Sequence, residues 1–455
     1  MSEGPPPLLD FAQSLLHEKR FAEAEHTFRA ICQHWPGESI GYNGLGLALE
    51  GLSRTTEASE SFRHAIRAGT DPAAGWNNLG HLHWVEGRLE EAAEAFQAAV
   101  AIRPDFTTAL LNLAHLHEER METDAALDAF ERVLYYKPGD SEANWNRALH
   151  QLLRGDYHSG FLGYEWRWVA GNRPERAFTQ ARWDGFPIEG KTILLHAEQG
   201  SGDTIQFARF ADLVARRGAK VILECPRGLV QVLKGVAGVS QIIAAGDGLP
   251  PFDTHCPLLS LPWALRLGLD GIPASVPYLH ADQSLSQVWQ DRLAEYKDEI
   301  RIGIVWAGDP QHPRDSSRST TSEGFERIAN IPGVRLFSLQ KNKGGNPLLL
   351  NPNVVDCTPE LDDYSDTAAL ISQLDLVISV DTSIAHLAGA LGRPVWTMLP
   401  YFPDWRWMLD REDSPWYPSM RLFRQTSRGD WSSVFDRIYA EVVQLQSLGI
   451  SRQPV

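Results

Sequence analysis

The pattern of apolar and polar positions changes once along the chain, after the loop "ARWDGFPIEGK" at residues 181–191. Before this loop, small, aromatic and proline positions recur with a fixed period of 34 residues, as they do in arrays of two-helix repeats. After it, apolar runs alternate with polar loops and amphipathic segments, which is typical of strand–helix–strand units. The chain is therefore predicted to divide into a helical repeat array and an α/β region.

Three columns of residues keep the 34-residue period. They are Pro36, Pro104 and Pro138; Ala24, Ala58, Ala92 and Ala126; and Phe28, Phe62, Phe96 and Phe130. Alanine lets the two helices of a repeat approach each other, phenylalanine fills the gap between them, and proline ends the second helix. The segment 76–104 resembles a tetratricopeptide repeat almost position by position. We predict four repeats over about 5–140 and a degenerate fifth from 141, within a repeat domain of 1–170 that ends in an aromatic-rich cap.

A polar column follows the same period. Asn78, Asn112 and Asn146 lie on the predicted first helix of their repeats, the helix that lines the concave face. A carboxamide donates and accepts hydrogen bonds at once, so it can pair with a peptide backbone without reading its sequence. The column resembles the asparagine ladder of O-linked N-acetylglucosamine transferases, whose repeat groove holds acceptor protein. Two interpretations remain open: binding of an acceptor peptide, or a bond from each asparagine to the adjacent repeat.

Two segments of the second region, 191–224 and 374–399, read as strand, polar loop, helix and second strand. Gly218 and Gly392 mark the ends of their helices. The apolar runs "QIIA", "RIGIVW" and "VRLFSL" supply further strands, and 284–299 reads as a helical connector. These elements predict an α/β fold of two facing Rossmann-like domains.

The predicted boundaries give each lobe its own sheet. The N-terminal lobe, expected on the acceptor side, covers 186–283, and the C-terminal lobe, expected on the nucleotide-sugar side, covers 300–428. A terminal helix within 429–455 is expected to pack back on the N-terminal lobe.

Each of the two units places an Asp-Thr pair where its strand meets its helix, at 203–204 and at 381–382. In open α/β sheets, ligands bind beyond the carboxyl ends of the strands, where these junctions lie. Helix capping by Asp and Thr is the alternative that needs no ligand. Capping accounts less well for Gly200 and Gly202, or for His386 one turn into the second helix. The two helix starts are therefore expected to face each other across a gap wide enough for an activated sugar.

The chemistry expected at the second corner follows from charge. A helix N-terminus favours phosphate, so the amides near Thr382 to Ile384 and the hydroxyls of Thr382 and Ser383 are expected to cradle it. His386 is expected to donate to the same group. A carboxylate repels phosphate, so Asp381 is expected to bond a sugar hydroxyl or to orient the loop.

The first corner is expected to carry the base. Asp203 would take a proton from an acceptor hydroxyl, a role that depends first on position and then on pKa. Gly200 and Gly202 would let the backbone come close to substrate, and Thr204 is grouped with them at the donor site.

The two corners resemble glycosyltransferase family 9, the heptosyltransferase type. "GSGDT" is similar to the family's first loop, whose aspartate, here Asp203, is the catalytic base. "VDTSIAHLAGALGRP" is similar to its second motif, with Ser383 in place of a glycine. The resemblance implies a GT-B fold and inverting transfer from a nucleotide-sugar without an obligatory metal, and no strand here ends in Asp-x-Asp. Together with the repeats, the chain resembles bacterial tetratricopeptide-repeat glycosyltransferases, some of which modify flagellin.

Further donor-site candidates lie at strand ends of the second lobe. They are Trp306, Gly308, Arg318, Gln340 and Lys341. Arg318 would neutralise the charge of the leaving group, or it is a solvated loop charge. The aromatic segment 401–418 would stack a sugar or base, or it packs between the lobes.

Composition narrows the class of protein. The chain of 455 residues carries 42 basic and 58 acidic side chains, a formal charge of -16 that argues against broad nucleic-acid binding. The four cysteines form no CxxC pair and indicate buried thiols in a reducing compartment. No 18-residue apolar run and no signal-peptide pattern are present, so the cytoplasm is the expected location.

The sequence thus predicts a cytoplasmic protein glycosyltransferase. Its repeats would hold an acceptor protein, for which the resemblance offers flagellin as a candidate, and its cleft would take a nucleotide-sugar co-substrate without cofactor or metal. Two rivals remain: a non-enzymatic repeat scaffold on a degenerate transferase fold, and a transferase that acts on a lipid or oligosaccharide.

Overall fold

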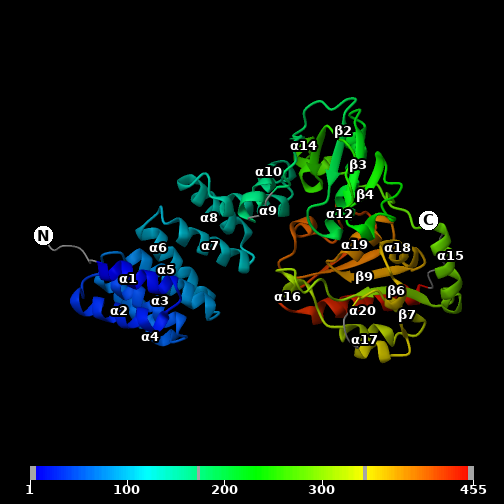
Figure 1. Ribbon diagram of the computed structural model, residues 1–455. Coiled ribbons are helices and arrows are strands. Elements are labelled where there is room, and N and C mark those ends of the chain that lie inside the picture. The colour runs from blue at the N-terminus through cyan, green and yellow to red at the C-terminus, as the bar shows by residue number, and fades with distance from the viewer. Residues whose placement is uncertain (1–6, 172–174, 342–345, 449–455) are drawn as a thin grey trace. The chain divides into compact units, whose positions relative to one another are not determined.

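The computed structural model describes residues 7–171, 175–341 and 346–448, which fall into two units (Figure 1). The first unit runs to His150 and also takes in Val169–Gly171, and the second holds Gln151–Trp168 and the chain beyond. The division comes earlier than the predicted boundary at 170. The reason is that the helices after the repeats make their contacts with the α/β region.

Paired helices make up the first unit. They are α1 (Pro7–His17), α2 (Phe21–His34), α3 (Ser39–Gly51), α4 (Thr55–Ala68), α5 (Pro72–Val85), α6 (Leu89–Ile102), α7 (Thr107–Glu119), α8 (Thr123–Tyr136) and the first turns of α9 (Ser141–Leu153). The alanines and phenylalanines of the 34-residue columns are all buried between them. Pro36, Pro104 and Pro138 each follow the end of a second helix. The predicted repeat architecture is confirmed.

The second unit begins with short helices and a five-stranded parallel sheet. These helices are α10 (Tyr157–Gly163), η1 (Tyr164–Trp166) and α11 (Arg167–Ala170). The strands are β1 (Ala181–Arg182), β2 (Thr192–His196), β3 (Lys220–Cys225), β4 (Val239–Ala244) and β5 (Thr254–Pro257), in the order β1-β5-β2-β3-β4. The connecting elements are α12 (Ser201–Ala208), α13 (Ala211–Ala215), η2 (Arg227–Leu229), η3 (Leu258–Ser260), α14 (Leu261–Leu265) and η4 (Leu269–Gly271). The chain turns to opposite sides of β2 to form β3 and β5.

A six-stranded parallel sheet follows the connector α15 (Gln283–Arg292) and η5 (Leu293–Tyr296). Its strands are β6 (Ile300–Val305), β7 (Val334–Ser338), β8 (Val354–Asp356), β9 (Leu376–Val380), β10 (Val395–Leu399) and β11 (Met420–Arg424). Between them lie α16 (Asp315–Arg318), α17 (Gly324–Ala329), η6 (Pro347–Leu350), η7 (Thr358–Glu360), α18 (Tyr364–Ser372), α19 (Ser383–Ala390) and η8 (Trp405–Trp407), and α20 (Trp431–Ser447) ends the fold.

The order of this second sheet, β11-β10-β9-β6-β7-β8, is that of a doubly wound sheet. Read from β6, the strands follow the pattern 3-2-1-4-5-6, so the winding reverses between β6 and β9. Val305 pairs with Ser379 at this point, which brings the ends of both strands together. The residues after β6 and after β9 therefore share the position where such sheets bind ligands.

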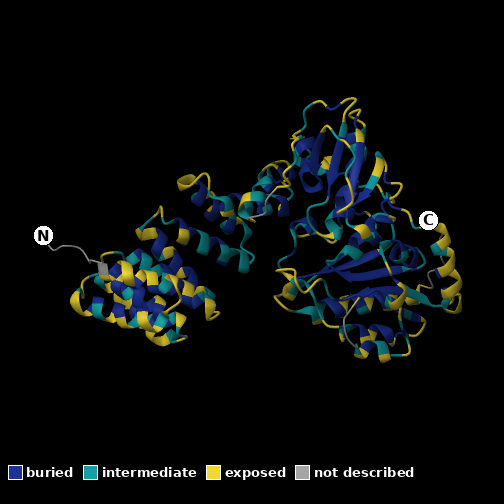
Figure 2. Ribbon diagram, in the orientation of Figure 1, coloured by how far each residue is buried: buried dark blue, intermediate teal, exposed yellow. Residues whose placement is uncertain are grey.

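Both sheets have buried strands covered by helices (Figure 2). Val434, Phe435, Ile438 and Val442 of α20 belong to the core of the second sheet, and α20 packs on α17 and β11. The expected packing of this terminal helix on the N-terminal lobe is therefore wrong.

The aromatic segment after the repeats has a partner in the second unit. The rings of Tyr157, Phe161 and Tyr164 each lie 5.6–6.0 Å from Trp405. The Trp416 indole also donates to the Tyr157 hydroxyl at 3.2 Å. The helices α10 and η1 are thus fixed to the loop 401–418.

Two general features bear on the class of protein. Every cysteine is free and buried. Among the described residues, no helix combines the length and the apolar character needed to cross a bilayer.

Candidate active site

The start of α12 carries Asp203 in the third helical position. Gly200 is the N-cap, and its amide donates to Asp203 Oδ2 at 2.9 Å. The Thr204 hydroxyl is buried and donates to the Gly200 carbonyl at 3.2 Å. The capping interpretation therefore holds for one carboxylate oxygen and for Thr204, whose hydroxyl is used within the helix.

The second oxygen of Asp203 accepts a hydrogen bond from the C-terminal lobe. Arg406 Nη2 donates to Asp203 Oδ1 at 2.5 Å, and the same guanidinium binds Gln206 and Asp404. Arg406 was not among the predicted site residues, because the segment 401–418 was considered only for its aromatic residues. The signal available was a lone cation between Trp405 and Trp407 in a segment expected to lie at the cleft.

The start of α19 is capped by its own hydroxyls. Thr382 is the N-cap, and its Oγ1 accepts from the Ile384 amide at 3.3 Å and shares a hydrogen bond with Ser379 at 3.0 Å. Ser383 Oγ accepts from the Tyr364 hydroxyl at 2.9 Å. Both hydroxyls expected to bind phosphate thus have partners within the protein.

Asp381, whose side chain is 16% exposed, lies beside the buried His386, with 3.9 Å between Asp381 Oδ1 and His386 Nε2. Burial, with the nearby charge of Asp404, raises the pKa of Asp381 to about 6. Burial also lowers the pKa of His386 to about 3, so its imidazole is neutral near pH 7. The ring stacks on Trp407 at 5.3 Å and its Nδ1 lies 2.9 Å from the Tyr417 hydroxyl. His386 is therefore a neutral hydrogen-bonding group at this site.

The two helix starts touch. A Cβ on Gly202 would lie 2.9 Å from His386 Cδ2 and 3.4 Å from Ser383 Cα, so only a glycine allows α12 to pack this closely on α19. The expectation of a sugar-sized gap at this point is wrong. Gly202 thus brings the two lobes into contact here.

Gln340, which follows β7, holds the backbone that follows β6. Gln340 Oε1 accepts from the amides of Trp306 and Ala307 at 3.0 and 2.8 Å. Trp306 itself is buried in the core of the second sheet. Their placement is that of structural residues, and it offers no ring face or free carboxamide oxygen to a donor. Lys341 is exposed, and its ammonium donates to the Leu361 carbonyl.

Arg318 lies at the point where the winding of the second sheet reverses. Its Nη1 donates to the Asp381 carbonyl at 3.1 Å, and its side chain is 18% exposed. A Cβ on Gly308 would lie 2.5 Å from Arg318 Nη2, so this glycine makes room for the guanidinium. The alternative of a solvated loop charge is wrong for Arg318. The structure brings Arg318, Gly308 and Asp381 together.

A cavity of about 490 Å³ lies elsewhere in the second unit. It is lined by Arg227, Val230, Gln231, Gln241, Ile242, Ile243, Ala244, Asp247, Gly248 and Asp363. Most of these residues lie on β4 and on the loops that follow β3 and β4, and Asp363 caps α18 of the other lobe. The next residue, Tyr364, bonds to Ser383, so α18 links this cavity to the start of α19.

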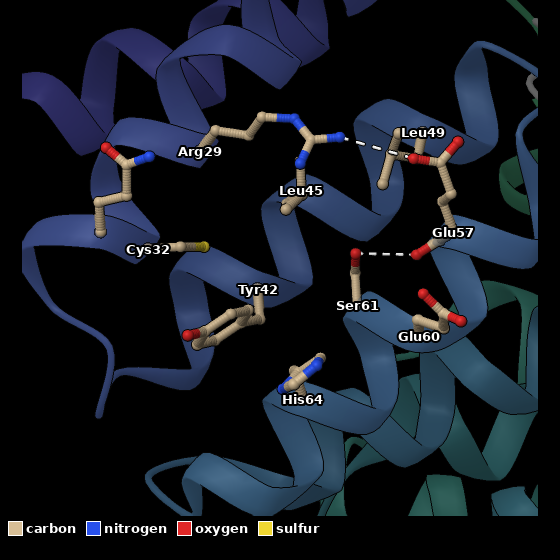
Figure 3. Close-up of a pocket in the computed structure, with 10 residues that line it drawn as sticks. Arg29, Cys32, Tyr42, Leu45, Leu49, Glu57, Glu60, Ser61 and His64 are labelled. Atoms are coloured by element: carbon tan, nitrogen blue, oxygen red, sulfur yellow. Dashed lines mark hydrogen bonds and ion pairs between the residues drawn. The ribbon is translucent and has the colours of Figure 1, made fainter.

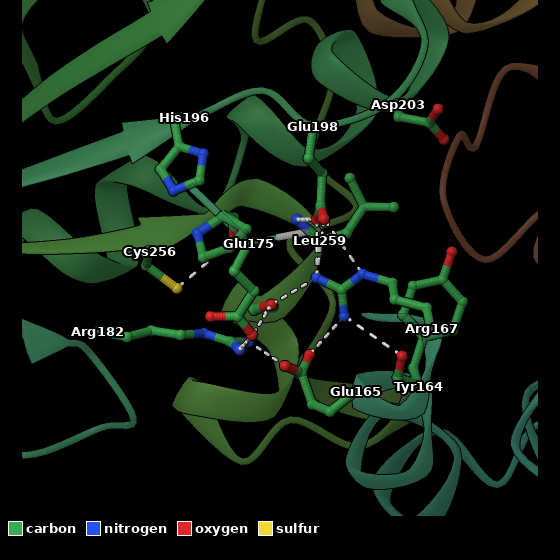
Figure 4. A network of polar contacts seen from close by, with 12 residues as sticks. Tyr164, Glu165, Arg167, Glu175, Arg182, His196, Glu198, Asp203, Cys256 and Leu259 are labelled. Carbon is green, nitrogen blue, oxygen red and sulfur yellow. Dashed lines mark hydrogen bonds and ion pairs between the residues drawn. The ribbon is translucent and has the colours of Figure 1, made fainter. Parts of the chain in front are cut away.

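A second polar network joins η1 and α11 to the loop that leads into α12, and Figure 4 shows it together with Asp203. Arg167 of α11 donates to both oxygens of Glu198, at 2.8 Å from Nη2 to Oε1 and 3.2 Å from Nε to Oε2. It also binds Glu165 and Ser260. Burial raises the pKa of Glu198, against the effect of the Arg167 charge. The helices after the repeats therefore also hold the loop that leads into α12.

The asparagines of the repeats form a chain of carboxamides. Asn78 donates to Asn43 at 3.4 Å, and Asn112 donates to Asn77 at 2.9 Å, each on the preceding repeat. Asn77 in turn donates to Asn78 at 3.3 Å. Asn146 makes no hydrogen bond with the described residues. The inter-repeat interpretation therefore describes Asn78 and Asn112, and binding of peptide by the column stays a prediction.

The repeat unit has a cavity of its own, of about 350 Å³, between α2, α3 and α4 (Figure 3). Its walls are Arg29, Cys32, Gln33, Tyr42, Leu45, Leu49, Glu57, Glu60, Ser61 and His64. None of the three predicted asparagines lines it. For metals, the described residues contain no group of three or more His, Cys, Asp or Glu side chains placed to hold an ion.

Comparisons with known proteins bear on both units. Residues 9–71 and 43–105 match one tetratricopeptide repeat model, and 84–152 match another. Residues 355–416 match the model of glycosyltransferase family 9 (heptosyltransferase). That match contains Asp381 through His386 and also Arg406.

One curated relative is Protein FlbA of Caulobacter vibrioides, which is 26% identical over 322 residues, 64% of this chain and 53% of that protein. The chain thus spans about half the length of this relative. Solved structures with similarity include YrrB, a repeat protein with an unusual peptide-binding site (19% identity, TM-score 0.30, 37% of this chain and 87% of that one). MamA is 18% identical with a TM-score of 0.31, and the match covers 36% of this chain and 95% of that one. The protein pilF of Pseudomonas aeruginosa is 17% identical with a TM-score of 0.34, and the match covers 37% of this chain and 77% of that one.

The second unit holds two parallel α/β sheets, as a GT-B-like region does, and the family match covers the start of α19 within it. The chain is thus similar to tetratricopeptide repeat proteins over residues 9–152 and to glycosyltransferase family 9 (heptosyltransferase) over residues 355–416.

Proposed function

We propose that this protein transfers a sugar from a nucleotide-activated donor to a Ser or Thr hydroxyl of an acceptor protein held by its repeats. The observation that carries the proposal is the start of α19, which lies where the second sheet reverses its winding and inside the family match. The reaction is of GT-B type, inverting, and independent of metal and cofactor. Flagellin is one candidate acceptor.

The proposed donor position follows from charge. Helix α19 presents its positive end, and Arg318 adds a cation beside Asp381. A diphosphate at this place would meet both, which favours the charge that develops as the nucleotide departs. The site lies beside the Gly202–His386 contact, where Asp203 and Asp381 are both within electrostatic range of Arg406.

The proposed chemistry uses one base. Asp203 accepts the proton of the acceptor hydroxyl, whose oxygen forms a bond to the anomeric carbon. The bond from that carbon to the phosphate oxygen breaks, and the nucleoside diphosphate leaves with the electron pair. Inversion follows because attack and departure take place on opposite faces of the sugar.

The acceptor proposal rests on the repeats. Asn146 makes no hydrogen bond with the described residues, so its carboxamide can pair with a peptide backbone. The acidic balance of the chain disfavours a nucleic-acid partner.

A nucleotide-sugar panel tests the function. The full-length protein is melted with each compound, because a ligand that binds the folded state alone raises the melting temperature. Hits are then assayed for release of nucleotide and transfer of sugar to protein. A shift together with turnover supports the transferase, whereas the absence of both with every donor class contradicts it.

One observation favours a second function. Both oxygens of Asp203 are hydrogen-bonded and the helix starts touch, as expected of a scaffold that binds a nucleotide as a signal without turnover. The same panel separates the two: a melting shift with a matched acceptor protein and no transfer would identify the scaffold.

A further inference from the structure

The Arg406 guanidinium joins the two lobes of the second unit. It extends from η8, with its side chain 8% exposed, and reaches first-lobe acceptors one helical turn apart on α12. Its Nη2 binds Asp203 Oδ1 at 2.5 Å and its Nε binds Gln206 Oε1 at 2.7 Å. The remaining amine, Nη1, binds Asp404 of its own loop at 2.8 Å. One cation thus spans three acceptors in a planar fork, which an ammonium cannot do.

The backbone of this loop is held on its other side. The Arg406 guanidinium lies 4.4 Å over the Trp405 ring, and that ring is surrounded by Tyr157, Phe161 and Tyr164. These aromatic residues belong to α10 and η1, which follow the repeats. The guanidinium therefore has a fixed origin as well as fixed acceptors.

The consequence for Asp203 is a carboxylate held at both oxygens. Oδ2 accepts from the Gly200 amide and Oδ1 accepts from Arg406. Both oxygens of the carboxylate therefore have a fixed direction, and position is the first requirement of a general base.

We propose that Arg406 is the positioning residue of the transfer reaction: it holds the Asp203 carboxylate in one orientation, and it does so only while the two lobes are together. This inference rests on the proposed function. Closure of the lobes and readiness of the base are then a single event, because the cation comes from one lobe and the base from the other.

The test compares Arg406→Gln and Arg406→Lys with wild type in the full chain. Arg406→Gln is expected to lower kcat tenfold or more with KM little changed, because the base loses the donor that orients it. Arg406→Lys keeps the charge but not the planar fork, so its kcat is expected to fall by more than twofold but less than that of Arg406→Gln. Donor binding, measured by titration, is expected to stay within threefold in both variants.

A matched control is Arg327→Gln, which removes an exposed ion pair with Asp436 in the same lobe and is expected to leave kcat and KM unchanged. A kcat within twofold of wild type in a folded Arg406→Gln variant overturns the proposal, as does a loss that appears in KM alone. If Arg406→Gln melts below the assay temperature, Arg406→Lys decides, and a kcat within twofold of wild type overturns the proposal. A wild-type protein without turnover refutes the proposed function instead.

Discussion

The starts of α12 and α19 share an Asp-Thr pair but differ in where it stands on the helix. In α12 the aspartate is the third helical residue and bonds back to the Gly200 amide. In α19 it precedes the N-cap, and the threonine does the capping. As a result, Asp203 accepts a hydrogen bond from a cation of the other lobe, whereas Asp381 lies partly buried beside a neutral histidine. The same dipeptide thus gives an ion-paired carboxylate at one corner and a carboxylate of raised pKa at the other.

The largest effect is expected from a substitution of Asp203 at the start of α12. Asp203→Asn keeps the size of the side chain and removes its basicity, so kcat is expected to fall by about 10²–10⁴, while titration shows donor binding little changed. Asp212→Asn is the control, because Asp212 pairs with Arg216 on the neighbouring helix α13. If kcat of a folded Asp203→Asn variant stays within threefold of wild type, the two corners do not differ as described.

The next prediction concerns Asp381, which precedes the start of α19. The pKa of Asp381 is raised to about 6, so the folded state holds a proton that the unfolded state releases at lower pH. The stability associated with that proton is present below the unfolded pKa and is lost as pH rises through about 6. Asp381→Asn is therefore expected to stabilise the fold by about 3 kcal/mol at pH 8 and by about half of that at pH 5.

Urea denaturation at the two pH values measures this difference. An equal gain at both pH values, or a loss at pH 8, would mean that Asp381 is ionised without cost. The same variant is expected to lose activity, since the carboxylate lies at the proposed donor site.

A smaller effect is expected where the corners meet. Gly202→Ala would place a methyl group 2.9 Å from a buried imidazole that is stacked on Trp407. Overpacking of this kind costs about 1–3 kcal/mol in the free energy of unfolding. Gly248→Ala is the control, because a Cβ there meets nothing within 4 Å. Equal melting of the two variants would show that the helix starts are not in contact in solution.

The smallest expected effect concerns the asparagine column of the repeats, whose members differ in their hydrogen bonds. Asn112→Ala removes a bond to Asn77 and is expected to cost about 0.5–1.5 kcal/mol. Asn146→Ala removes no hydrogen bond among the described residues, so the melting temperature is expected to stay unchanged. Acceptor protein is expected to bind more weakly to this variant. Loss of stability without loss of binding in both variants would leave the column a purely structural one.

Much of the fold could be predicted because its signals are local. Repeated columns of alanine and phenylalanine specified the helix pairs, and apolar runs bounded by glycine specified the strands of both sheets. A terminal helix was expected within 429–455, and α20 spans Trp431–Ser447. Its packing was predicted wrongly because the apolar face of a helix does not say which core receives it. That depends on the tertiary path of the chain.

The site was predicted less completely, for the same reason. The approach of Arg406 to Asp203 joins residues far apart in the sequence, and no local pattern reports it. The roles of Trp306 and Arg318 could not be decided from the sequence. Trp306, an aromatic residue at a strand end that was expected at the donor site, lies in the core, whereas Arg318, for which both alternatives stayed open, donates to the Asp381 carbonyl. Burial decides these roles, and it follows from the packing of both lobes.

The contact between Gly202 and His386 offers a chemical reporter of lobe motion. The imidazole is buried between the backbone of α12 and the Trp407 ring, and it stays uncharged across the usual assay range. Carbethoxylation needs an uncharged, accessible ring nitrogen, so this histidine should react with diethyl pyrocarbonate only when the lobes separate. Peptide mapping by mass spectrometry would single it out among the 15 histidines and time the opening directly.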